Sequence, residues 1–206
     1  MTLLELIVVV AVLGFLAAMI LPALLNKRPH AQRIFCDMNL KQVGLAFRIW
    51  EGDNGDIYPT GIAVTNGGAR EMVETGNVLR VFLVMSNELN TPKVLVCPED
   101  FRRNVATNFS SLSSANVSYF AGVDVTNESN PQQILSGDSI LTINGKPVKS
   151  GLVSISTNNV LSWQPNRHGK AGNLMMADGS AQSATDLGLE TYFTGTGVAT
   201  NRLAIP

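Results

Sequence analysis

An apolar run close to the N-terminus constrains this chain more than any other feature of its sequence. The run extends from Leu6 to Leu25, and one proline, Pro22, interrupts it. As an α-helix it would be about 30 Å long, because each residue adds about 1.5 Å, and this length matches the hydrocarbon thickness of a bilayer. The sequence therefore predicts a membrane-spanning helix within residues 1–25.

A carboxylate, Glu5, stands immediately before the apolar run. An ionised carboxylate is costly in hydrocarbon unless it is paired, so Glu5 needs a cation. The amino group of Met1 lies about one helical turn away, and the same two groups could also pair between neighbouring, staggered copies. A cleaved signal peptide would begin with Lys or Arg and carry a shorter apolar stretch. A plain single-span anchor fits the length but leaves Glu5 unexplained.

The residues Met1-Thr2-Leu3-Leu4-Glu5-Leu6-Ile7, followed by Gly14 and Pro22, resemble the mature N-terminus of type IV pilins and type II secretion pseudopilins. In that family a prepilin peptidase removes a short basic leader, the new first residue is N-methylated, and the N-terminal helices bundle into a filament core. The resemblance implies that Met1, Glu5 and Pro22 act in assembly, with Glu5 neutralising the N-terminal amine of a neighbouring subunit. Met1 departs from the family's usual Phe and no leader is present. Either the chain is in its mature form with an unusual first residue, which we favour, or Met1 is an initiator and the argument for processing weakens.

The length and net charge of the chain limit its possible domain organisation and partners. The chain has 206 residues, of which 15 are basic and 16 acidic, and a net charge of −1. About 180 residues follow the apolar run, which is enough for one domain with its own core. The balanced charge provides no strong field that would recruit nucleic acid or anionic lipid. A basic cluster at residues 27–33 is interpreted as a solvated or headgroup-level collar.

A second helix is expected after the apolar run. Pro22 and Pro29 each remove a helical hydrogen bond, so a kink or local melting is predicted between them. Beyond them, apolar residues at steps of 4, 3, 4 and 3 predict a helix from about residue 31 to 51 with one face on a domain core. The residues of this stripe are Cys36, Leu40, Val43, Phe47 and Trp50. We assign residues 26–52 to this amphipathic continuation and residues 53–206 to a globular head.

The chain contains two cysteines, Cys36 and Cys97. A membrane anchor implies an extracytoplasmic domain, where disulfides persist. A bridge between the two cysteines would close a loop of about 60 residues and stabilise the fold by about 4 kcal/mol. A zinc site would need more ligands at close spacing, and the sequence offers none. We therefore expect a Cys36–Cys97 disulfide.

Two further patterns are similar to a large bacterial group of prepilin-type proteins. The segment from Cys36 to Phe47 has the spacing C-x-x-N-L-K-Q-x-G-L-A, and an acidic, Gly-rich turn followed by Tyr58-Pro59 closes it. Nearer the C-terminus, nine residues separate His168 from Asp178-Gly179. The resemblance implies an architecture but no chemistry.

The head is expected to be α+β. Residues 71–89 predict a helix-rich segment, residues 94–98 a short strand, and residues 192–206 a surface tail. Turn signals at Asn144-Gly145 and Asp178-Gly179 predict two hairpins, the second with a primed turn. Further strands are expected at residues 119–121, 152–156 and 160–163. The predicted fold is a pilin-like ladle: a long N-terminal helix, kinked near Pro22, packed on a small antiparallel β head.

His168 is the residue most open to a catalytic interpretation. A His–Asp pair would need a nucleophile, and the sequence has no Gly-x-Ser-x-Gly elbow. Phosphate-loop, dinucleotide and kinase motifs are also absent from the sequence. Trp163, Arg167 and His168 could form a ligand-binding edge, but we favour a structural histidine that fixes the hairpin. We expect no enzymatic activity.

Metal binding and glycosylation have weaker sequence support. Major pseudopilins, which this chain resembles, bind calcium in a C-terminal loop, and calcium needs six to eight oxygen ligands. The calcium candidates here are Asp124, Asp138, Asp178 and Asp186, which form no compact Asp-x-Asp set. Candidate glycosylation positions lie in Ser- and Asn-rich segments. They are Asn108, Ser110, Ser111, Asn116 and Asn127.

The function expected from these features is structural. The chain would be the subunit of an extracellular type IV pilus-like or pseudopilus filament on a bacterial surface, a helical homopolymer held in the inner membrane before assembly. A prepilin peptidase and a separate assembly ATPase and platform would act on it. Nucleic acid is not indicated as a partner. The alternative is a membrane-tethered extracytoplasmic binding module that does not polymerise.

Overall fold

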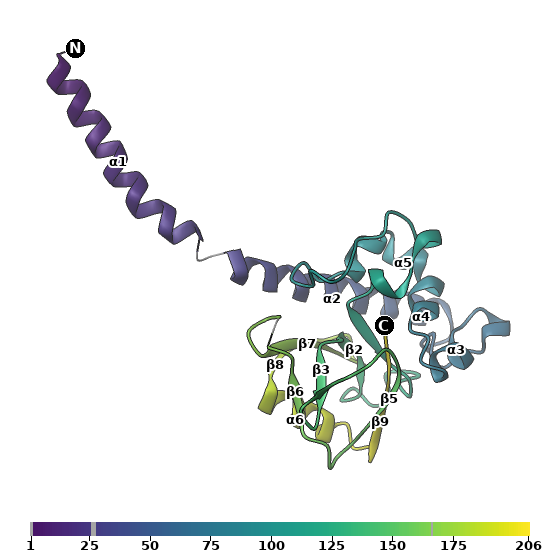
Figure 1. Ribbon diagram of the computed structural model, residues 1–206. Helices are drawn as coiled ribbons and strands as arrows, with labels where there is room; N and C mark the ends of the chain where they lie inside the picture. Colours follow the sequence, from purple (N-terminus) through teal and green to yellow (C-terminus); the bar gives the residue numbers. More distant parts are fainter. Residues whose placement is uncertain (1, 26–27, 166) are drawn as a thin grey trace.

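The computed structural model describes residues 2–25, 28–165 and 167–206, and their side chains apart from those of residues 21–31. Two helices lead the chain, α1 (Leu3–Leu25) and α2 (Arg28–Asp53). Helix α1 extends away from the head, whereas α2 lies along it (Figure 1). The window Leu3–Ile20 has a mean hydropathy of 2.8 and none of it is buried in the chain. By length and composition α1 can cross a bilayer, as the apolar run predicts.

Helix α1 begins with a reciprocal capping arrangement that the sequence analysis overlooked. The Thr2 hydroxyl accepts a hydrogen bond from the Glu5 N–H at 3.3 Å, and Glu5 Oε2 accepts one from the Thr2 N–H at 2.7 Å. This is the capping box expected of the pattern Thr-x-x-Glu. Glu5 therefore has a local structural role. The amine of Met1, its predicted partner, lies outside the described residues.

The predicted interruption of the helix falls partly outside the described residues. The backbone of α1 remains helical through Pro22 to Leu25, and α2 has already begun at Arg28, so Pro29 lies in its first turn. Proline is tolerated at that position because the first N–H groups of a helix have no intrahelical acceptor. The rest of the predicted interruption, at residues 26 and 27, lies outside the described residues.

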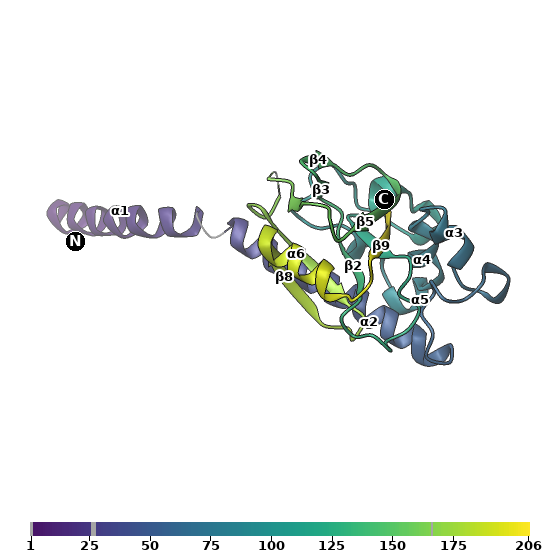
Figure 2. The same ribbon diagram turned by 90° about the horizontal axis from the view of Figure 1, so that it is seen from below.

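Helix α2 packs on the head through the predicted stripe. Cys36, Leu40, Val43 and Phe47 are fully buried and Trp50 is nearly so. The helix contacts strands β2, β7 and β8, whose bounds are given below, so it covers one face of a sheet (Figure 2). The opposite side of α2 exposes a second set of large apolar side chains, which was not predicted. They are Ile34, Phe35, Met38, Leu45 and Ile49.

Short helices follow α2. They are η1 (Val64–Asn66), α3 (Arg70–Glu74), α4 (Leu79–Val84), α5 (Ser86–Leu89), η2 (Pro92–Leu95), η3 (Phe109–Ser111) and η4 (Ser114–Asn116). The contacts of α2 include two of them, α5 and η2. The helix-rich segment is thus confirmed, but the strand predicted at residues 94–98 is wrong. The Thr91 side chain accepts from the Lys93 N–H and Pro92 occupies the first turn of η2. This cap and proline start a helical turn in a segment whose composition favours a strand.

The rest of the chain is mainly antiparallel sheet, so the fold class is α+β. One sheet has six strands in the order β5-β9-β1-β2-β7-β8, and a second has three in the order β4-β3-β6. The strands are β1 (Tyr119–Gly122), β2 (Ile134–Asp138), β3 (Leu141–Ile143), β4 (Lys146–Pro147), β5 (Gly151–Ser156), β6 (Leu161–Trp163), β7 (Ala171–Met176), β8 (Ala181–Thr185) and β9 (Thr200–Ile205).

Two hydrophobic cores lie on opposite faces of the six-stranded sheet. Successive side chains of a strand point to opposite faces. Tyr119 accordingly belongs to the core under α2, while its neighbour Phe120 belongs to the core under the smaller sheet and α6 (Asp186–Gly195). In β7, Met175 faces α2 and Leu174 faces away. The sheet is therefore the middle of three layers and is buried on both faces.

The two predicted hairpins form, but with different turns. Asn144 and Gly145 both have positive φ, 51° and 75°, as a primed turn between β3 and β4 requires. The turn between β7 and β8 is longer: Gly179 has φ +83° and donates its N–H to the Met176 carbonyl at 3.0 Å, while Asp178 keeps an ordinary φ. The primed turn predicted at Asp178-Gly179 is wrong, because the loop contains one more residue than such a turn allows.

The surface tail predicted at residues 192–206 is also wrong. Residues up to Gly195 continue α6, and β9 pairs with both β5 and β1 inside the large sheet. The buried end of β9 comprises Leu203, Ala204 and Ile205. Its pairing partners lie 44 to 83 residues earlier in the chain, so local periodicity could not reveal the strand.

Candidate functional site

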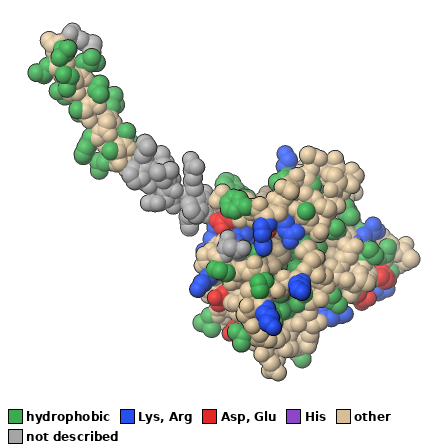
Figure 3. Space-filling model, in the orientation of Figure 1, with side chains coloured by type: hydrophobic (Ala, Val, Ile, Leu, Met, Phe, Trp, Pro, Cys, Tyr) green, Lys and Arg blue, Asp and Glu red, His purple; other side chains and the backbone are tan. Residues whose placement is uncertain are grey.

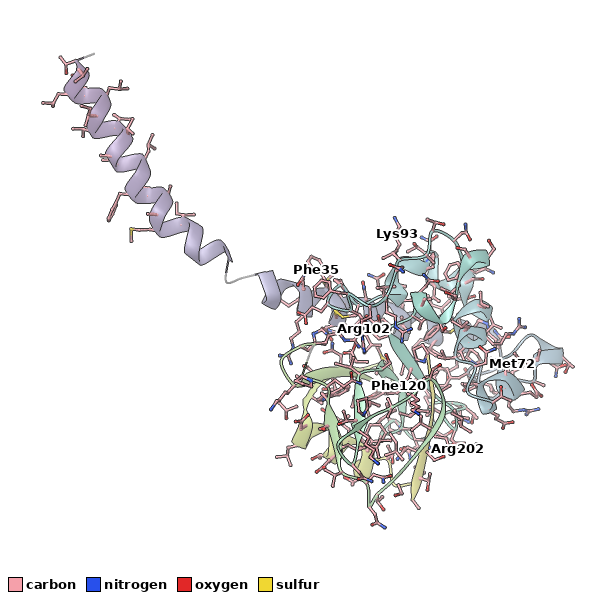
Figure 4. The ribbon with its side chains drawn as sticks, in the orientation of Figure 1. Phe35, Met72, Lys93, Arg102, Phe120 and Arg202 are labelled. Carbon is pink, nitrogen blue, oxygen red and sulfur yellow. A yellow bond between two sulfur atoms is a disulfide. The ribbon has the colours of Figure 1, made fainter. Side chains whose placement is uncertain are left out.

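The motif residues converge at the junction between α2 and strand β7. Cys36 and Gly44 come from α2, Tyr58 from the loop after it, and His168 and Gly179 stand at the two ends of β7. In Figure 4 the label of Arg102 stands close to the place where α2 meets the head. The structure forms the predicted disulfide between Cys36 and Cys97. Segments that are far apart in the sequence thus build one buried cluster.

His168 lies against the disulfide. Its Nε2 is 3.3 Å from Cys97 Sγ and 3.7 Å from Asp138 Oδ2. On the other side of the ring, Nδ1 is 2.9 Å from Glu99 Oε2, although among the described atoms it has no partner in hydrogen-bond geometry. The His168 N–H donates to the same Glu99 oxygen at 2.9 Å. The predicted structural histidine therefore has carboxylate neighbours, but they come from outside its hairpin.

The backbone around His168 has an unusual conformation. His168, Gly169 and Lys170 all have positive φ, 56°, 61° and 64°. A non-glycine residue in this region carries a cost of about 1–2 kcal/mol, which the surrounding structure must offset. The conformation places the imidazole beside the disulfide immediately before β7 begins at Ala171.

A buried ionic network supports the same loop. The Arg167 guanidinium contacts Asp100 Oδ2 and, at 3.1 Å, Asp138 Oδ1. All three side chains are at most 2% exposed. Asp138 Oδ2 also accepts from the backbone N–H of Asn173 at 2.8 Å, and Asp100 Oδ2 accepts from the Ser118 hydroxyl at 3.1 Å. One arginine thus joins the loop after Cys97 to strand β2 and to the start of β7.

Burial controls the protonation of the titratable groups at this junction. Burial lowers the pKa of His168 below its usual 6.5, and Asp138 and Glu99 oppose this shift only in part. The imidazole is therefore neutral at pH 7. Burial also raises the pKa of Tyr58 to about 12 and raises the pKa of the Glu51 carboxyl.

The Asp178-Gly179 end of the motif docks on α2. The Tyr58 hydroxyl donates to the Ala177 carbonyl at 2.6 Å. A Cβ on Gly179 would lie 3.3 Å from Arg48 Cγ, so a larger residue would press on the helix as well as being strained at positive φ. Asp178 Oδ1 accepts from the Ser180 N–H at 2.8 Å and stabilises the turn itself.

The middle of β7 also packs closely against α2. A Cβ on Gly44 would come within 2.4 Å of Met175 Sδ and Cε, so the glycine leaves room for this buried methionine. Elsewhere on α2, the Asn39 amide donates to the Val96 carbonyl at 3.0 Å, and the Tyr119 hydroxyl donates to the Cys36 carbonyl at 3.3 Å. The motif residues whose contacts are described here all hold α2, β7 and the Cys97 segment together.

The ligand-binding edge suggested for Trp163, Arg167 and His168 does not form. All three residues are buried, and Trp163 belongs to the core on the far face of the sheet, where its ring packs against Gly172. The hydroxyl in this network, Ser118, is fully buried and donates to Asp100. It therefore lacks the access that a nucleophile needs.

The four calcium candidates lie apart, each with another partner. Asp124 pairs with Arg202 on β9, Asp138 with Arg167, Asp178 caps its own turn, and Asp186 accepts from the Trp163 N–H at 2.8 Å. Among the residues that the structure describes, the one group of three potential metal-ligating side chains is Cys36, Cys97 and His168. The sequence analysis missed it because His168 lies 71 residues from Cys97.

The glycosylation candidates lie at the surface or partly buried. Asn108, Ser110 and Ser111 are exposed, and Asn116 and Asn127 are partly buried. The Asn116 amide donates to the Asn104 carbonyl at 2.7 Å, and the Asn108 side chain accepts from the Ser111 N–H at 2.9 Å. These contacts give both asparagines a role in their own turns, and glycosylation stays a prediction.

Several residues of the junction were not predicted. Glu99 and Asp100 follow Cys97 after one proline, and Asn173 and Arg48 come from β7 and α2. The Glu-Asp pair beside a cysteine, and the Arg-His pair beside β7, are the sequence signals that could have indicated a buried ionic network. Comparison with models of protein families, with curated proteins and with solved structures found no match to this chain.

Proposed function

We propose that this chain is the structural subunit of an extracellular filament of the type IV pilus or pseudopilus kind, assembled through its N-terminal helices. The observation that supports the proposal is an apolar surface that continues past the membrane-length helix. Helix α1 is exposed and apolar along its side (Figure 3), and α2 bears an exposed apolar stripe of Ile34, Met38, Leu45 and Ile49. We refer to these four residues as the outer stripe.

The outer stripe lies opposite the buried stripe of α2. At about 100° per residue, its four members fall within about 60° of one another, roughly 170° from the centre of the core-facing stripe. Their exposed fractions are between 45% and 59%. Beside the stripe, Lys41 pairs with Asp37 at 2.7 Å. Helix α2 is therefore apolar on two opposite faces, and the head covers only one of them.

A membrane alone does not account for the outer stripe. Helix α1 has 23 residues and is about 35 Å long, which already spans a bilayer of about 30 Å. The outer stripe lies beyond that length, on the part of α2 that packs on the sheet, so a simple tether would leave it in water. Helices of neighbouring copies would cover both α1 and the outer stripe.

The two surfaces would contribute differently to assembly. Moving α1 from lipid to protein exchanges one apolar environment for another, so its gain comes from packing and pairing. The outer stripe moves from water to protein. Complete burial of such a side chain contributes about 1.5–3 kcal/mol, so these half-exposed residues would contribute roughly 1 kcal/mol each before the costs of association.

Glu5, at the start of α1, would make the pairing between neighbouring subunits selective. Its capping contact with Thr2 fixes the carboxylate at the first turn of α1. In the proposed filament this carboxylate neutralises the amine of a neighbouring Met1. Before assembly the subunit would lie in the inner membrane of a bacterium, where a prepilin peptidase and a separate assembly ATPase and platform act on it.

Electron microscopy of material sheared from the cell surface tests the proposal. Wild type should give helical filaments, and mass spectrometry should find an N-methylated Met1. Leu45→Glu should abolish the filaments without unfolding the head, because Leu45 is 59% exposed. Gln42→Glu places the same charge on an exposed position beside the outer stripe and should leave filaments intact. Glu5→Gln retains a capping side chain but removes the charge, so it should also abolish assembly.

A wild-type chain that stays a membrane-bound monomer with an unmodified Met1 would refute the proposal. The tethered binding module would then be favoured, and one observation indicates where it would bind. A cavity of about 240 Å³ opens beside α6, and its lining includes Asn158, Asn159, Glu190 and Asn201 around Phe193. Amide and carboxylate groups around an aromatic ring suit a polar ligand such as a sugar.

A further inference from the structure

The disulfide and His168 form a set of potential metal ligands. Cys36 Sγ, Cys97 Sγ and one ring nitrogen of His168 all lie within 4.8 Å of one another. Both cysteines are fully buried, and the His168 side chain is too. The three residues come from α2, from the segment after η2 and from the loop before β7. A sulfur, sulfur and nitrogen set of this kind is typical of sites for zinc and other thiophilic metals.

A carboxylate lies beside the far side of the imidazole, at contact distance although not in hydrogen-bond geometry. Glu99 Oε2 lies 2.9 Å from Nδ1 and also accepts from the His168 backbone N–H. In metal sites the second ring nitrogen of a ligating histidine faces a carboxylate or carbonyl, which fixes the tautomer and leaves Nε2 as the donor atom. Here Nε2 is the nitrogen that faces Cys97 Sγ, at 3.3 Å. The ring is thus oriented for ligation.

We propose that reduction of the Cys36–Cys97 disulfide converts this cluster into a buried Zn²⁺ site, with two thiolates and His168 Nε2 as ligands. Zinc takes four ligands in a tetrahedron, with Zn–S distances of about 2.3 Å and Zn–N distances of about 2.0–2.1 Å. A water molecule or Asp138 Oδ2, which is 3.7 Å from Nε2, can fill the fourth position. The hard cations Ca²⁺ and Mg²⁺ do not suit these donors.

The disulfide is first reduced and the metal then binds to the two thiols. A dithiol reductant is oxidised to its own disulfide by thiol–disulfide exchange, and Cys36 and Cys97 together take up two electrons and two protons. Binding of Zn²⁺ then releases both protons and forms two Zn–S bonds and one Zn–N bond. The disulfide joins α2 only to the Cys97 segment, whereas the metal would also join the loop before β7. A subunit that has not yet been oxidised would therefore keep α2 fastened to its head.

Cobalt binding by the full-length protein in detergent micelles tests this inference independently of filament formation. The chain is reduced in guanidinium, freed of reductant without oxygen, and refolded with Co²⁺. We expect one Co²⁺ per chain, thiolate-to-cobalt charge-transfer absorption, the visible bands of tetrahedral Co²⁺, and displacement by Zn²⁺. The oxidised protein should show none of these signals, and reduced Cys36→Ser, which keeps a single thiolate, should bind Co²⁺ more weakly and show a reduced charge-transfer absorption.

Two variants distinguish a specific metal site from adventitious binding of metal to the thiols. Glu99→Gln keeps all three ligands and should weaken metal binding by about 10–100-fold, as losses of outer-shell partners do. His168→Gln removes a ligand and should weaken binding further, with circular dichroism of its oxidised form as the check on folding. Absence of tetrahedral cobalt bands in the reduced wild type would overturn the proposal. Unchanged affinity in Glu99→Gln would do so even if His168→Gln fails to fold.

Discussion

Replacing Arg167 by methionine tests whether the buried ionic network holds the head together. Arg167 is 2% exposed and lies between Asp100 and Asp138, whose side chains are 2% and 0% exposed. Methionine retains much of the apolar length of arginine but has no charge and no donor. The substitution therefore leaves two buried carboxylates without their shared cation and changes the packing little.

The expected loss of stability depends on the contacts that the two carboxylates retain in the variant. Removing one partner of a buried ion pair costs about 3–5 kcal/mol, because the remaining charge is uncompensated. Asp138 would still accept from the backbone and the side chain of Asn173, at 2.8 and 3.2 Å. Asp100 would keep the Ser118 hydroxyl at 3.1 Å and two other cations, Arg102 at 3.5 Å and Arg103 at 3.8 Å. These contacts place the loss near the lower limit. We expect the free energy of unfolding to fall by about 3 kcal/mol, roughly a 150-fold change in the unfolding constant.

The matched control is Arg202→Met, which breaks an ion pair at the surface. Arg202 and Asp124 form a two-point contact in which the side chains are 38% and 39% exposed. Figure 4 shows Arg202 at the rim of the head. Exposed pairs contribute about 0–1 kcal/mol, so this variant should be nearly as stable as wild type.

Guanidinium unfolding of the full-length protein in micelles, followed by circular dichroism at pH 7, measures both variants. A triple variant that combines Arg167→Met with Asp100→Asn and Asp138→Asn should recover part of the loss, because it buries no unpaired charge. Equal losses in the Arg167 and Arg202 variants, or no recovery in the triple variant, would refute the reasoning.

The remaining predictions concern packing and pH. Gly172→Ala should destabilise the protein by about 1–3 kcal/mol, because a Cβ at this position would lie 2.5 Å from the Trp163 ring. The control is Gly52→Ala in α2, where a Cβ would meet no atom within 4 Å, and it should be neutral or stabilising in the same unfolding assay. Because folding lowers the pKa of His168 below 6.5, the unfolded chain takes up its proton first as the pH falls. Stability should therefore decrease from pH 7 to pH 5.5, and His168→Gln should lack this part of the decrease; identical profiles for variant and wild type would contradict the assignment.

Features set by local periodicity were predictable from the sequence. The stripe from Cys36 to Trp50 repeats at helical spacing, and it is buried as predicted. The Asn144-Gly145 turn was predictable because a primed turn needs two residues that tolerate positive φ. In these cases the sequence near the element determines its conformation.

Features set by distant contacts were not predictable. Strand β9 forms because β5 and β1 offer it partners on both sides, and nothing in residues 200–205 themselves indicates this. The outer stripe was not predicted, because the buried stripe alone already explained α2 as an amphipathic helix with one face on the core. At the candidate site, the disulfide followed from counting cysteines, whereas the approach of His168 to Cys97 depends on how β7 lies against α2.

The position of β9 affects the order in which a newly made chain can mature. Among the described strands it is the last to leave the ribosome, yet it lies between β5 and β1 in the large sheet. Since chains grow at about 5–20 residues per second, the apolar N-terminal helix is available for insertion many seconds before the sheet can close. Residues near the C-terminus thus control completion of the head, and in the proposed filament subunit α1 would enter the membrane while the head is still open.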